Sequence, residues 1–282
     1  MYEGTIWEKI WKVIYPVLIY FFIQIFVRFI GESILTSVYT NSLQEYTDSK
    51  GITASYGYMG GLNEFIDKYS VILTIISLLI TVIVVYFLYK RDASLRVDLE
   101  RPKVKLGSVI ILAIVMSTGF SRLLSLMFSS KLLNTYEEVE QNLVSGNIVL
   151  VIIGSGILAP LVEEYIFRGL VYTRLKQFMS VNAATIVCAL MFGLFHMNLP
   201  QGMYTAILGL GLCFVYEKFN TIWAPIVFHV SANIFSIIMT KTGLSRLLSV
   251  SMLSYVLIML FELALTAVFF YLLVRKKPHK NS

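Results

Sequence analysis

The chain consists largely of long apolar runs separated by short polar segments. A helix needs roughly 20 apolar residues to cross the ~30 Å hydrocarbon core of a bilayer, and most of the runs approach or exceed that length. We therefore predict eight helices, of which the sixth is the shortest, with a polar loop outside the membrane from Tyr39 to Tyr69. The runs cover residues 11–36, 70–89, 106–128, 147–170, 182–198, 203–217, 221–240 and 251–274.

The composition indicates the same class. Hydrophobic residues make up 57% of the 282 positions, charged residues make up 14%, and the mean hydropathy is +0.76. A single soluble core could not hide that much apolar surface. We predict an all-α, polytopic protein of the cell membrane, with the lipid bilayer as its surroundings.

Basic residues are concentrated in one connecting segment and in the C-terminal tail. Because cytoplasmic loops carry an excess of Lys and Arg, both segments are expected on the cytoplasmic side, and an even number of helices places the N-terminus there too. The net charge of +6 is mostly this topological signal and does not indicate binding to nucleic acid. The basic residues are Lys90, Arg91, Arg96, Arg101, Lys103 and Lys105 in one segment and Arg275, Lys276, Lys277 and Lys280 in the tail.

Two adjacent carboxylates, Glu163 and Glu164, interrupt the fourth apolar run. Ionisable residues inside a membrane are costly and favour a functional interpretation with a named partner. Residues four apart share one face of a helix, so Glu164 is expected to form an ion pair with Arg168. Glu163 points elsewhere and has no counter-ion nearby in the sequence, which makes it the candidate general base.

Three further polar residues fall within later apolar runs. His229 and Asn233 are four residues apart and can both donate hydrogen bonds, so together they could stabilise an oxyanion. His196 lies near the end of the fifth run, beside Gly193, which would allow another helix to approach closely. Glu163, His196 and Asn233 each lie about 20 Å along their helices from the presumed cytoplasmic ends. These residues are therefore expected to share one layer.

The spacing of these residues resembles a known family. Residues 163–168 are similar to the EExxxR motif of the CAAX-protease and bacteriocin-processing family (CPBP, or Abi) of intramembrane endopeptidases. Residues 192–196 resemble its FxxxH motif and residues 229–233 its HxxxN motif, in the same order. The resemblance covers about residues 147–240.

The resemblance implies a peptidase with an intramembrane catalytic cavity. Glu163, aided by His196, would activate a water, His229 and Asn233 would hold the oxyanion, and Glu164 with Arg168 would support the site. Residues 141–282 would then form the catalytic core and basic tail, and residues 1–140 would be transmembrane helices of unassigned role. No cofactor is expected, although Glu163, His196 and His229 could supply three ligands to a divalent metal such as zinc.

The expected partner is a peptide or membrane-protein substrate, and no oligomeric state is predicted. The resemblance to CAAX endopeptidases suggests a lipidated or hydrophobic peptide, whereas the family's link to bacteriocin genes suggests small bacterial peptides and self-immunity. Two alternatives belong to other classes: a non-catalytic immunity or scaffold protein, and a proton-coupled transporter. A transporter would usually show repeats or paired broken helices, and neither is clear in this sequence. Arg122 and Glu262, in the third and last runs, are candidates for a second polar pair.

Overall fold

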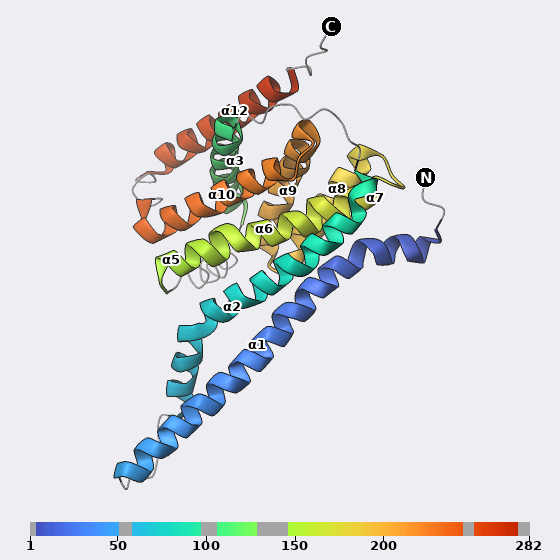
Figure 1. Cartoon of the computed structure of the whole chain (residues 1–282). Coiled ribbons are helices and arrows are strands. Elements are labelled where there is room, and N and C mark those ends of the chain that lie inside the picture. The colour runs from blue at the N-terminus through green and yellow to red at the C-terminus, as the bar shows by residue number, and fades with distance from the viewer. Residues whose placement is uncertain (1–3, 51–57, 97–105, 129–145, 245–250, 276–282) are drawn as a thin grey trace.

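The computed structural model describes residues 4–50, 58–96, 106–128, 146–244 and 251–275, and every regular element within these ranges is a helix. Seven of the helices are long and apolar enough to cross a membrane. The prediction of an all-α, polytopic membrane protein is therefore confirmed. Figure 1 shows two long helices along one side of the molecule and the remaining helices gathered beside them.

The first two helices are much longer than their apolar runs. Helix α1 covers Ile6–Lys50 and α2 covers Tyr58–Arg91, so the loop predicted between Tyr39 and Tyr69 is wrong for residues 39–50 and 58–69, which are helical. Residues 51–57 lie outside the described residues. High hydropathy marks only the part of a helix that lies in lipid. Here the polar residues beyond each apolar run are also helical, in both α1 and α2. The rings of Tyr39 and Phe65 pack across this hairpin, with centroids 5.5 Å apart. In Figure 1 the α1–α2 pair projects beyond the other helices.

On the opposite side of the bundle, α3 (Leu106–Met127) packs against α10 (Trp223–Thr242) and α12 (Met252–Arg275). Arg122 and Glu262 join α3 to α12 through an ion pair of 3.2 Å, as the sequence suggested. Neither residue lines the cavity described below, so this pair is a separate polar cluster.

A continuous helix from Ile148 to Leu175 carries both central glutamates and contains two widened, π-helical segments. The first π segment precedes Pro160, which lacks an N–H and would clash with a carbonyl four residues earlier in a regular helix. A wider turn accommodates that ring, and such turns are frequent at functional sites. In order, the pieces are α5 (Ile148–Val151), η2 (Ile152–Leu158), α6 (Ala159–Glu164), η3 (Tyr165–Tyr172) and α7 (Thr173–Leu175).

The fifth apolar helix, not the sixth, is the shortest. Helix α8 covers only Val181–Phe195, whereas α9 covers Leu199–Phe219. The boundary between them falls early because Asn198 caps α9 through its side chain and Pro200 occupies the first turn, both of which favour a helix start. The close approach predicted at Gly193 is confirmed, since an added Cβ would lie 2.5 Å from the carbonyl oxygen of Gly202.

Candidate active site

The residues singled out in the sequence surround one cavity of about 310 Å³. It is lined by side chains from six helical segments besides α6, including both of the N-terminal helices. Glu163, His196 and Asn233 therefore lie close together, as the rise per residue of their helices predicted. The polar lining consists of Glu163, His196, His229 and Asn233, together with Tyr20, Thr74, Ser155, Gln201, Tyr204, Thr205 and Ser236.

The ion pair predicted between Glu164 and Arg168 is formed and wholly buried. Arg168 Nη1 lies 3.0 Å from Glu164 Oε1, and neither side chain is exposed. Arg168 also donates from Nη2 to the carbonyl oxygen of Gly209 on α9, at 3.2 Å, and its guanidinium lies over the ring of Phe192. These contacts tie α6 and η3 to α8 and α9.

Glu163 turns away from Arg168 and lines the cavity while remaining only 8% exposed. Nε2 of His229 lies 3.7 Å from Glu163 Oε2. Tyr20 of α1 lines the same cavity and packs on the ring of Phe195, with centroids 4.9 Å apart. Glu163 is thus a nearly buried carboxylate that faces an open space among polar groups.

His229 lies between Glu163 and Glu164, and this position was not predicted from the sequence. Its Nδ1 lies 2.8 Å from Glu164 Oε1, the oxygen that also accepts from Arg168. A carboxylate paired with arginine can only accept, so the hydrogen is on Nδ1 of His229. Glu164 therefore orients His229 as well as pairing with Arg168.

His196 is held in a similar way by neutral partners. Its Nδ1 lies 2.8 Å from the carbonyl oxygen of Phe192 and 3.2 Å from Thr205 Oγ1. Because a carbonyl oxygen only accepts, Nδ1 carries the hydrogen, and in the neutral ring Nε2 is then an acceptor. Thr205 belongs to α9, outside all three motifs, and only its polarity within an apolar helix distinguishes it in the sequence.

Asn233 lines the cavity from α10 and also joins two helices. Its Nδ2 donates to the carbonyl oxygen of Ser155 in η2, at 3.0 Å. An amide nitrogen has two hydrogens, so this bond leaves one for another acceptor.

The side chains do not form the three-ligand metal site that the sequence allowed. Among the described residues, no three His, Cys, Asp or Glu side chains converge as metal ligands. Nδ1 of His229 is already engaged by Glu164, and Nδ1 of His196 by Phe192 and Thr205.

Fold and cavity define a class: an all-α membrane protein with a Glu- and His-lined cavity among its spanning helices. Residues 145–235 match the family model described as "Type II CAAX prenyl endopeptidase Rce1-like". This part of the chain contains every candidate site residue and is similar to the Rce1-like family, in agreement with the resemblance seen in the motifs.

One curated relative is a bacterial membrane protein. Over 90 residues the chain is 32% identical to the "Putative membrane peptidase YdiL" of Bacillus subtilis (strain 168). That alignment covers 32% of this chain and 37% of the relative, so the chain matches little more than a third of the relative's length. No solved structure matches the chain.

Proposed function

We propose that this protein is an intramembrane endopeptidase that hydrolyses a peptide bond of a membrane-associated or hydrophobic peptide. The observation that carries the proposal is the position of Glu163: nearly buried, without an arginine or lysine partner in the described contacts, and facing a cavity shared with His196, His229 and Asn233. The family of residues 145–235 and the printed name of the bacterial relative support the same activity.

In the proposed mechanism Glu163 acts as the general base. A water in the cavity gives its proton to Glu163 while its oxygen attacks the scissile carbonyl carbon. Nε2 of His196 accepts the other hydrogen bond of this water and so orients it. Glu163 then passes the proton to the departing amine nitrogen, which leaves a carboxylic acid and an amine as products.

His229 and Asn233 are assigned to the oxyanion. Asn233 donates from the amide hydrogen that Ser155 does not use. His229 already donates from Nδ1 to Glu164, so it can donate to the oxyanion only from Nε2 of a doubly protonated ring. That Nε2 lies 3.7 Å from Glu163 Oε2.

Substrate chemistry follows from the surroundings. The cavity lies among membrane-spanning helices, so the scissile bond must belong to a segment that reaches into the bilayer. The family description names a CAAX prenyl endopeptidase, and the relative is named only as a putative membrane peptidase. We propose a hydrophobic or lipid-anchored peptide as the substrate class.

Comparison of membrane peptidomes tests the activity. Cells with wild-type protein and cells with Glu163→Gln should differ in a defined set of peptides, with the uncleaved precursor accumulating in the variant. Glu217→Gln is a matched control, since Glu217 lies on α9, pairs with Lys176 and does not line the cavity. A folded Glu163→Gln protein that retains every wild-type effect would instead favour a scaffold or immunity protein, and solute flux in proteoliposomes would favour a transporter.

A further inference from the structure

A second cavity, of about 260 Å³, lies between α1 and α2. We call it the α1–α2 cavity. Six of its eight lining residues have polar side chains, namely Gln24, Arg28, Glu32, Ser70, Thr74 and Ser77, and Ile25 and Leu73 complete the lining. Thr74 also lines the cavity that contains Glu163, so the two spaces meet at this residue.

Polar groups of the α1–α2 cavity join α1 to α2. Ser77 donates to Gln24 Oε1, and Gln24 Nε2 donates to Thr81 Oγ1 at 3.3 Å. Such bonds often join membrane helices. Helix joining alone, however, does not require the open space beside them, which is large enough for several waters.

Arg28 and Glu32 lie at the outer part of this cavity. They form an ion pair of 2.6 Å, and the Arg28 side chain is 69% exposed. A charged pair in this position needs water or polar ligands nearby, because an exposed charge in hydrocarbon is costly. This end of the α1–α2 cavity is therefore hydrated.

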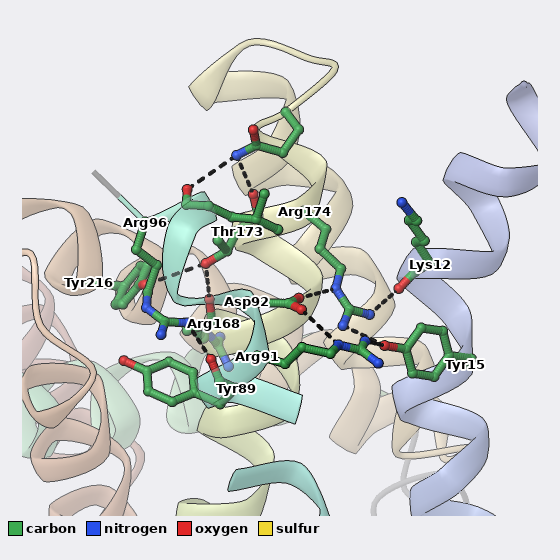
Figure 2. Close-up of polar contacts among 12 residues, drawn as sticks. Lys12, Tyr15, Tyr89, Arg91, Asp92, Arg96, Arg168, Thr173, Arg174 and Tyr216 are labelled. Carbon is green, nitrogen blue, oxygen red and sulfur yellow. Dashed lines mark hydrogen bonds and ion pairs between the residues drawn. The ribbon is translucent and has the colours of Figure 1, made fainter. Parts of the chain in front are cut away.

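The N-terminal part of α1 is bonded to the helix that carries Glu163. Arg174, at the end of α7, donates to Asp92 at 2.6 Å, to Tyr15 at 2.6 Å and to the carbonyl oxygen of Lys12 (Figure 2). Arg174 and Asp92 are both buried. We call this cluster the basic end; it seals α1 and α2 to α7.

Distances along the helices place the α1–α2 cavity far from the basic end. Arg28 lies about 24 Å along α1 from Lys12, and Thr74 lies about 26 Å along α2 from Arg91. Glu163 lies about 18 Å from the end of α7, so it is nearer the middle of the bundle. Arg28 and Thr74 thus lie about 6 to 8 Å farther from the basic end than Glu163 does.

We propose that the α1–α2 cavity is the aqueous entrance to the catalytic cavity. Water and an extended, polar stretch of peptide backbone would enter there, from the end opposite the basic end. If the basic end is cytoplasmic, as the charge pattern predicts, this entrance opens on the external side. The role of the peptide rests on the proposed function, whereas the hydration of the path does not.

Cysteine labelling tests the path. Because a thiol reacts as its thiolate, a membrane-impermeant thiol reagent modifies only cysteines that water reaches. The native Cys188 and Cys213 are buried and leave a low background. We expect Ser70→Cys and Thr74→Cys to be labelled from one side of the membrane in intact cells or oriented vesicles.

Two control variants are compared with Thr74→Cys. Ser94→Cys, in the 3₁₀ turn η1 (Asp92–Leu95) at the basic end, should be labelled only from the other side. Ile76→Cys lies at the depth of Thr74 on the lipid-facing side of α2, where Ile76 is 42% exposed. Its reaction rate should be roughly one tenth of the rate of Thr74→Cys or lower, because its thiol lies in lipid. Thr74→Cys that reacts no faster than Ile76→Cys, or only from the side of Ser94, overturns the path.

A second measurement tests the passage of peptide. Modification of Ser70→Cys, which lines only the α1–α2 cavity, with a bulky maleimide should abolish cleavage of the precursor found in the peptidome comparison, whereas modification of Ser94→Cys should not. Full cleavage after complete modification of Ser70→Cys overturns entry of the peptide by this path. If the wild type cleaves nothing, the proposed function fails, but the labelling result stands by itself.

Discussion

Replacement of Arg168 by methionine removes the positive charge from the buried ion pair while keeping much of the side-chain volume. Among the described contacts Glu164 then keeps only the hydrogen bond with His229, and the Glu164 side chain is fully buried. Breaking a buried pair by removing one partner costs about 3 to 5 kcal/mol. Against a typical total stability of about 5 to 15 kcal/mol, that loss is large.

Thermal unfolding in detergent measures this loss. We expect Arg168→Met to lower the midpoint by on the order of 10 °C. The double variant Glu164→Gln/Arg168→Met should recover most of the loss, because no uncompensated charge remains and the glutamine oxygen can still accept from Nδ1 of His229. Glu163→Gln should unfold close to the wild type, since Glu163 makes no contact with Arg168 among the described ion pairs.

Two results would refute this reasoning. A double variant as unstable as Arg168→Met would show that the lost contacts with Gly209 and Phe192, not the stranded carboxylate, cause the instability. An equally unstable Glu163→Gln would show that the two glutamates do not have separate roles.

Further predictions concern catalysis, metal dependence and topology. Asn233→Ala should lower turnover ~100-fold to 1000-fold with little change in peptide affinity, and near-normal turnover would leave Asn233 as a helix-packing residue. Thr205→Val should lower kcat and alter its pH profile because His196 loses a partner at Nδ1, whereas Thr205→Ser should restore both; unchanged kinetics in Thr205→Val would exclude a positioning role. Chelators should leave activity intact, and a reversible loss restored by zinc would point to a metal site. Reporter fusions after Lys105 and Ser282 should lie in the cytoplasm, and external signals would reverse the orientation.

The sequence predicted the parts of the site that depend on one helix at a time. The pair between Glu164 and Arg168 follows from their four-residue spacing and forms even though Arg168 lies in a π segment. The common depth of Glu163, His196 and Asn233 follows from the constant rise of a helix. Both are properties of a single helix, which a sequence pattern can express.

The contacts between helices were not predicted, because they depend on how each helix is rotated about its axis. Spacing could not show that His229 faces Glu164, nor that Thr205 of α9 reaches His196. The contribution of α1 and α2 was missed for a related reason: Tyr20 and Thr74 match no motif and lie more than 80 residues before Glu163. Hydropathy also predicted both helices to be shorter than they are, because each continues through polar residues beyond its apolar run and these two extensions pack against each other.

Charge conservation explains why the proposed chemistry suits a cavity of this kind. When water gives its proton to Glu163, the negative charge leaves the carboxylate and appears on the attacked carbonyl oxygen, so the total charge within the cavity does not change. In a medium of low dielectric constant, moving a charge between fixed partners costs less than creating one. His229 is 3.7 Å from Glu163 Oε2 and is also assigned to the oxyanion, so the same donor would be near the charge before and after the transfer. Glu164 and Arg168 keep that donor in place without taking up the proton themselves.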